Sequence, residues 1–65
     1  MPHPPAFAVL TGRRKYDLEL QIICTTKANA QKEVRDLKRD YGMEDARVKE
    51  FADESEAYDW VERNS

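Results

Sequence analysis

The chain of 65 residues is 40% hydrophobic and 37% charged, which supports one small domain rather than a disordered acidic tail. No apolar run approaches the ~20 residues that a membrane-spanning helix requires, so we expect no membrane association. The formal net charge of −2 is divided unevenly, because residues 1–39 contain eight Lys or Arg against four Asp or Glu, and residues 40–65 contain three against nine.

The first five residues, MPHPP, contain all three prolines and predict a flexible N-terminal tail before a single domain at residues 6–65. His3, the only histidine, has no neighbouring cysteine, second histidine or carboxylate. We therefore interpret it as a solvated tail residue rather than a metal ligand or a general base. The segment also lacks the charged region and apolar core of a secretory signal peptide.

Two strands joined by a turn are predicted next. Residues 6–10, AFAVL, form a short apolar run, and residues 11–15, TGRRK, supply a turn through Gly12. Residues 16–25, YDLELQIICT, alternate in polarity, which is typical of a half-buried strand. One face of that strand would carry Tyr16, Leu18, Leu20, Ile22 and Cys24. The whole segment predicts a β-hairpin with a basic tip.

A helix is predicted over residues 27–41, followed by a third strand at residues 46–51. Thr25 or Thr26 can cap the helix, and Gly42 can end it. Its apolar stripe consists of Ala30, Val34, Leu37 and Tyr41. A second helix is predicted after Asp53, because Asp53 and Glu56 form an Asp variant of the capping box. Its apolar face consists of Ala57, Trp60 and Val61.

The element order β-β-α-β-α predicts an α+β fold with a three-stranded antiparallel sheet of order 2-1-3 and both helices on one face. The expected core comprises Phe7, Val9, Leu18, Leu20, Ile22, Val34, Leu37, Tyr41, Val48, Ala57, Trp60 and Val61. The opposite sheet face would then be open to solvent, with Ala8, Leu10, Ile23, Arg47, Lys49 and Phe51 on it. The strand at residues 16–25 would lie at the sheet edge, where it could pair with a second copy in a homodimer.

Positive charges gather in two parts of the sequence. Residues 13–15 place three adjacent cations at the hairpin tip, and the first helix sorts its cations and carboxylates onto different flanks. The predicted binding surface comprises Arg13, Arg14, Lys15, Lys32, Arg35, Lys38, Arg39, Arg47 and Lys49. Such cations suit contact with an acidic protein surface or with phosphate. The alternative interpretation is that these are ordinary solvated turns and helix faces.

The sequence contains no recognisable catalytic set. Its only histidine is in the tail, its two glycines form no phosphate loop, and no metal-ligand spacing occurs. We therefore expect no enzymatic activity, no cofactor and no metal. Cys24 is the only cysteine and lies in an apolar strand pattern, which favours a buried hydrophobe over a reactive thiol. A single cysteine in so small a domain also favours a reducing, cytoplasmic setting.

Parts of the chain resemble the viroplasmin-like, hybrid-binding domain found at the N-terminus of eukaryotic-type ribonuclease H. The matching residues are Phe7-Ala8-Val9, Gly12-Arg13-Arg14, Ala46, Lys49, Phe51 and Glu54 to Ala57. The resemblance implies a three-stranded antiparallel sheet with two helices, and binding to RNA/DNA hybrids or double-stranded RNA. It also implies that Phe7 and Lys49 contact the nucleic acid.

Two functions are compatible with these features. The first is a non-enzymatic protein-binding module, an adaptor, inhibitor or regulator of a larger protein with an acidic or mixed surface. Its support is the small size, the surface of both charges and the lack of catalytic groups. The alternative is a module that contacts the backbone of duplex nucleic acid or RNA/DNA hybrid through the basic hairpin tip and helix flank. Against it stand the net acidity and the few exposed aromatic residues available for stacking.

Overall fold

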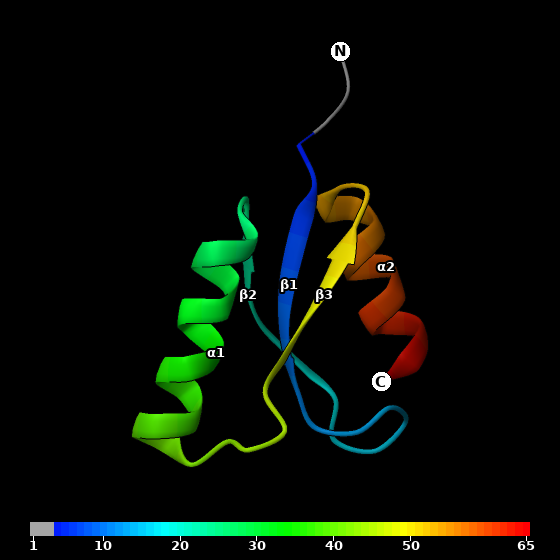
Figure 1. Ribbon diagram of the computed structural model, residues 1–65. Helices are drawn as coiled ribbons and strands as arrows, with labels where there is room; N and C mark the ends of the chain where they lie inside the picture. Colours follow the sequence, from blue (N-terminus) through cyan, green and yellow to red (C-terminus); the bar gives the residue numbers. More distant parts are fainter. Residues whose placement is uncertain (1–3) are drawn as a thin grey trace.

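The computed structural model describes residues 4–65 and contains the predicted β-β-α-β-α order (Figure 1). The elements are β1 (Ala6–Thr11), β2 (Glu19–Cys24), α1 (Lys27–Tyr41), β3 (Arg47–Phe51) and α2 (Glu54–Asn64). The three strands form one antiparallel sheet of order β2-β1-β3, which confirms the predicted α+β topology. Of the predicted tail at residues 1–5, residues 1–3 lie outside the described part, and Pro4 and Pro5 are exposed without regular structure.

Both helix starts follow the predicted capping chemistry. The Thr26 hydroxyl accepts a hydrogen bond from the Asn29 amide at 3.2 Å, and the Asp53 carboxylate accepts one from the Glu56 amide at 2.8 Å. Each cap satisfies an amide that has no partner inside its helix. Gly42 ends α1 with φ of 66°, the left-handed conformation that favours glycine. Local sequence therefore determines where these two helices begin and where α1 ends.

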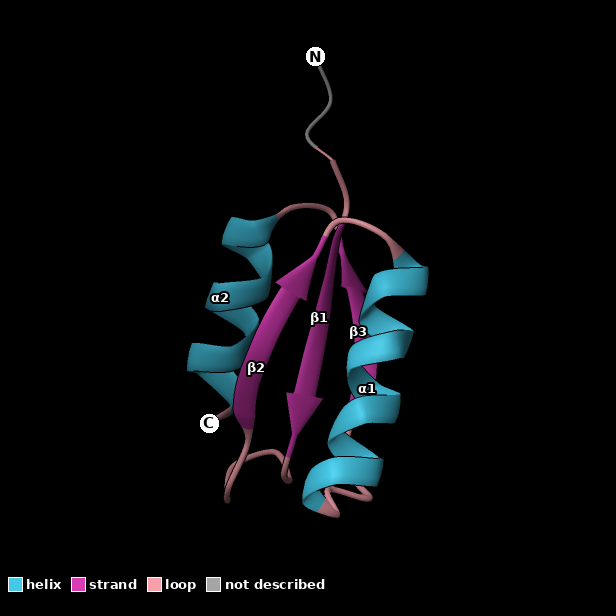
Figure 2. Ribbon diagram, turned by 90° about the vertical axis from the view of Figure 1, so that its left-hand side faces the viewer, coloured by secondary structure: helices cyan, strands magenta, loops and turns pink. Residues whose placement is uncertain are grey.

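The prediction that both helices lie on one face of the sheet is wrong. Alternate residues of β1 point to opposite faces, and both sets are packed under a helix. Val9 packs with the α1 residue Ala30, whereas Ala8 and Leu10 pack with the α2 residue Ala57. Figures 1 and 2 show the sheet between the two helices, which make no contact with each other within residues 4–65.

The width of the sheet explains this arrangement. Neighbouring strands lie ~4.8 Å apart, so the outer strands of a three-stranded sheet are separated by only ~10 Å. A helix with its side chains is itself ~10 Å across, and α1 already contacts all three strands. The helix that follows β3 therefore finds apolar surface to cover only on the other face.

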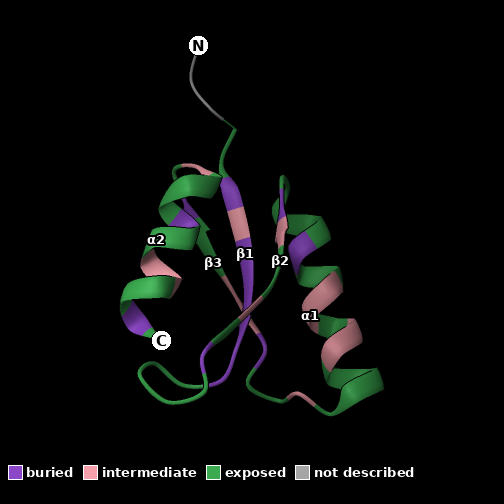
Figure 3. Cartoon of the chain, turned by 180° about the vertical axis from the view of Figure 1, so that it is seen from behind, coloured by how far each residue is buried: buried purple, intermediate pink, exposed green. Residues whose placement is uncertain are grey.

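Because the helices cover opposite faces, the residues that are buried differ from those expected in the core. Ala8, Leu10 and Phe51, expected on an open sheet face, are buried under α2. Ile22 and Tyr41, expected in the core, are 42% and 73% exposed. Figure 3 shows β1 buried along most of its length, while the last turn of α1 is exposed. The continuous apolar run AFAVL is the sequence signal of a strand that is covered on both faces.

A β-bulge explains why the predicted alternation in β2 is wrong. Leu20 pairs with Leu10, but Ile22 pairs with Val9, so Gln21 is an extra residue in the ladder. The extra residue reverses the side-chain directions after it. Leu20 therefore contributes to the α2 side of the core, whereas Ile22 and Cys24 lie on the α1 side with Val9.

Candidate docking surface

Two of the three predicted cations of the hairpin tip, Arg13 and Arg14, contact neighbouring side chains. The Arg13 guanidinium lies 3.8 Å from the Asp17 carboxylate and over the Tyr16 ring. The Arg14 Nε donates a hydrogen bond to the Asn64 side chain at 2.9 Å, and the backbone amide of Lys15 donates to the Asn64 carbonyl. The tip is therefore fastened to the C-terminal end of α2 instead of projecting freely.

Two cations gather around one aromatic side chain on the α2 side of the sheet. The Lys49 ammonium lies 5.2 Å from the centre of the Trp60 ring, and the Arg14 guanidinium lies 5.8 Å from it. Lys49 also lies over Phe51, which itself packs against Trp60 with a ring separation of 5.8 Å. Both cations therefore make cation–π contacts with this indole.

The α1 cations occupy a different part of the molecule. Lys32, Arg35, Lys38 and Arg39 are all exposed on the helix that covers the opposite face. Arg39 forms ion pairs of 3.0 Å with Asp36 and with Asp40. The hydrogen bond to Asp40 is the largest cause that raises the pKa of Arg39. These pairs join the two flanks that the sequence pattern separates.

The predicted binding surface is therefore not one continuous surface. Arg14 and Lys49 lie on the α2 side, whereas the four α1 cations lie on the other side of the sheet. Arg47 lies on β3, and its guanidinium donates a hydrogen bond to the Asp45 carbonyl at 3.1 Å. Arg14 and Lys49 meet at Trp60, and Arg47 lies on the same face of the sheet because it pairs with Leu10. The four α1 cations form a separate group.

An apolar groove that the sequence pattern did not predict lies beside the edge strand. A groove of about 360 Å³, which we call the edge groove, runs between α1 and the edge strand β2. Its lining residues are Gln21, Ile22, Glu33, Leu37, Tyr41 and Met43. The exposed Ile22 and Tyr41 noted above both belong to it. Grouped exposed apolar side chains of this kind mark interaction sites more often than single ones do.

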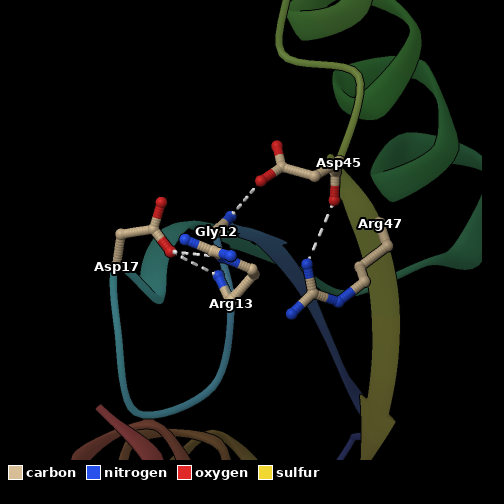
Figure 4. A network of polar contacts seen from close by, with 5 residues as sticks. All are labelled: Gly12, Arg13, Asp17, Asp45 and Arg47. Atoms are coloured by element: carbon tan, nitrogen blue, oxygen red, sulfur yellow. Dashed lines mark hydrogen bonds and ion pairs between the residues drawn. The ribbon is translucent and has the colours of Figure 1, made fainter.

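An acidic groove continues the edge groove along β2. It has a volume of about 290 Å³ and is lined by Thr11, Gly12, Asp17, Glu19, Met43 and Asp45. Because Met43 lines both grooves, they form one surface. The Asp45 carboxylate accepts a hydrogen bond from the Gly12 amide at 2.7 Å (Figure 4). The Arg13 amide donates to Asp17 at 2.7 Å, and this hydrogen bond is the main cause that lowers the Asp17 pKa.

The outer edge of β2 is open beside these grooves. Within residues 4–65, no backbone hydrogen bond from outside the sheet reaches Glu19–Cys24. The other edge strand, β3, carries the charged side chains of Arg47, Lys49 and Glu50, which discourage pairing with another chain. The C-terminal half of β2 instead carries two consecutive isoleucines, Ile22 and Ile23. Of the two edges, β2 is the better template for an added strand.

Three sequence signals point to this surface in retrospect. The Ile22-Ile23 pair interrupts the alternation of β2 where the bulge occurs. Tyr41 belongs to the helical stripe but is the last residue of α1, beyond the sheet that could cover it. Finally, the acidic flank of α1 is the flank of Glu33, which lies over the β2 edge. The sorting of charges on α1 therefore places a carboxylate, that of Glu33, at the edge groove.

The groups of residues 4–65 that bear on catalysis are the possible metal ligands and Cys24. Within residues 4–65, no three His, Cys, Asp or Glu side chains are arranged to hold a metal ion. Cys24 is buried beside Val9 and Ala30, as its strand pattern predicts. Burial raises the pKa of its thiol, and the Glu33 carboxylate raises it further. A buried thiol with a raised pKa is a poor nucleophile.

Comparison with known proteins identifies no relative of this chain. No protein-family model matches the chain, and neither a curated protein nor a solved structure matches it. The resemblance to the hybrid-binding domain of ribonuclease H therefore stays a prediction. Among the described residues, no helix combines the length and the apolar character needed to cross a membrane.

Proposed function

We propose that this chain is a non-enzymatic protein-binding module that docks its partner along the β2 edge and the edge groove. The observation that carries the proposal is the exposed Ile22 beside an open strand edge and an open apolar groove. An edge strand gives a partner backbone hydrogen bonds, and the groove gives it apolar contact. The module would act as an adaptor, inhibitor or regulator by occupying a site on a larger protein.

Photocrosslinking tests the place of docking. A photoreactive benzoylphenylalanine replaces either Tyr41, in the edge groove, or Tyr58, an exposed tyrosine on α2 that serves as the matched control. In an extract of the cells that contain the protein, we expect a protein crosslink from position 41 that Ile22→Lys abolishes. A crosslink that forms equally from position 58, or one that survives Ile22→Lys, would contradict the proposal.

Nucleic-acid binding is the alternative function, and the Arg14, Lys49 and Trp60 cluster is the observation that favours it. Cations next to an aromatic ring are typical of sites for single strands and bases. However, both cations already lie over the Trp60 ring, where a base would have to stack. The remaining cations are distributed over both sides of the sheet and do not follow one backbone path.

We therefore expect no binding of duplex DNA, duplex RNA or RNA/DNA hybrid tighter than about 100 μM at physiological salt, the weak end of non-specific binding. Fluorescence anisotropy at low and physiological salt measures this directly. The double variant Arg35→Glu/Arg39→Glu should leave the signal unchanged. Micromolar binding that weakens steeply with salt and is lost in the double variant would establish the alternative function.

A further inference from the structure

The surface along β2 carries negative charge that the chain does not neutralise. Within residues 4–65, Glu19, Glu33 and Asp45 have no cationic group within ion-pair distance, whereas Asp17 is paired with Arg13. No Lys or Arg lines either groove. Arg47 is near, but it contacts the backbone carbonyl of Asp45 rather than the carboxylate. A ligand of this surface therefore meets three uncompensated carboxylates.

The acidic and apolar parts are arranged in series along the strand. Glu19 lines the acidic groove, and Gln21 and Ile22 line the edge groove. The bulge at Gln21 is what brings Ile22 to the same side of the sheet as Glu19. Leu20 and Gln21 lie between Glu19 and Ile22, but the bulge leaves their β1 partners, Thr11 and Val9, only two positions apart. The two side chains are therefore spaced by ~7 Å along the strand. A strand lying beside β2 would pass both parts in succession.

We propose, on the basis of the docking function above, that the partner supplies an extended basic and apolar segment that pairs with β2 as a fourth strand. An apolar side chain of the segment enters the edge groove against Ile22 and Leu37. A Lys or Arg on the same face, two or four positions away, lies over the acidic groove near Glu19 and Asp45. This spacing follows from the two-residue repeat of side chains along a strand.

The same charges argue against a second copy of this chain as the occupant. A two-fold dimer would bring the same surface of both copies together. Such a dimer would gather Glu19, Glu33 and Asp45 of both copies at one interface, and no Lys or Arg lines either groove to neutralise them. A segment of another protein with positive charge has no such penalty.

Selection from a library of displayed random peptides of about eight residues, a usual strand length, tests the proposal on the full chain. We expect enriched peptides to place an apolar residue two or four positions from a Lys or Arg. Their affinity should fall roughly tenfold or more in Glu19→Lys/Glu33→Lys, since the contact with Glu19 becomes repulsive and a second positive charge replaces Glu33 on the same surface. Selection on this double variant should enrich Asp and Glu instead. Tyr58→Ser, on α2, is the matched control and should bind as the original chain does.

The outcomes separate this inference from the proposed function. Neutral or acidic peptides that still require Ile22 would overturn the inference and leave docking at β2 intact. Peptides that bind Ile22→Lys and Tyr41→Ser as well as the original chain would overturn both. Self-association in sedimentation that Ile22→Lys abolishes would assign the edge to a second copy and also overturn the inference. Circular dichroism of each variant establishes that it is folded, and Tyr41→Ser changes a side chain that is 73% exposed.

Discussion

Gly12→Ala is expected to remove most of the stability of the fold, about 3 kcal/mol or more, which places it among the most damaging single substitutions. Gly12 has φ of 83°, and a Cβ built there would lie 1.9 Å from the backbone oxygen of Asp17. The obstacle is backbone, so no side-chain rotation relieves it. The turn would have to open, which would also break the hydrogen bond from the Gly12 amide to Asp45.

Urea unfolding of Gly12→Ala and of Gly42→Ala measures this effect against a matched control. Gly42 also has a positive φ, of 66°, but a Cβ there meets nothing within 4 Å. Only the backbone preference is lost at Gly42, for which we expect a cost of about 1 kcal/mol. Equal destabilisation by the two substitutions would show that the contact between Gly12 and Asp17 does not constrain the turn.

Leu10→Ala is expected to destabilise the fold by about 2–5 kcal/mol, the usual range for deleting a buried leucine side chain. Leu10 is fully buried in the cluster that β1 forms with Phe51 and Ala57. A domain of this size has a total stability near the low end of the usual ~5–15 kcal/mol. The variant should therefore lose a large part of its stability and unfold at a markedly lower urea concentration than the original chain, as measured by circular dichroism.

Ile22→Ala is the control for this prediction, because Ile22 lies in the neighbouring strand but is 42% exposed. We expect a cost of about 1 kcal/mol or less there, since much of the side chain already contacts water. The comparison tests the two-sided core directly. If α2 did not cover this face of the sheet, Leu10→Ala would cost no more than Ile22→Ala.

The open β2 edge has a cost that supports a functional explanation. An uncovered edge strand with an exposed isoleucine is a template for unwanted pairing. The other edge, β3, is protected by charged side chains. In this sheet, charged side chains therefore protect the β3 edge from pairing, whereas the β2 edge is accessible and lies beside the edge groove. The uncompensated carboxylates along the accessible edge favour a basic segment over a second copy of the chain.

The sequence by itself determined the elements and their order. Thr26, Gly42 and Asp53 set the helix limits through hydrogen bonds and backbone conformation within a few residues, so local chemistry suffices to predict them. The sheet order also followed, because connection rules restrict three antiparallel strands to few arrangements. The buried position of Cys24 followed from its strand pattern.

Only the tertiary structure decided which surfaces are buried and which are free. The helix faces depend on the width of the sheet relative to a helix, and the bulge at Gln21 depends on the register between β1 and β2. The AFAVL run and the Ile22-Ile23 pair are consistent with both features, but neither the sheet width nor the strand register can be derived from these short patterns alone. The edge groove joins Ile22, Leu37 and Met43 from a strand, a helix and a loop. Such a surface exists only after the chain has folded, since residues distant in the sequence form it by packing.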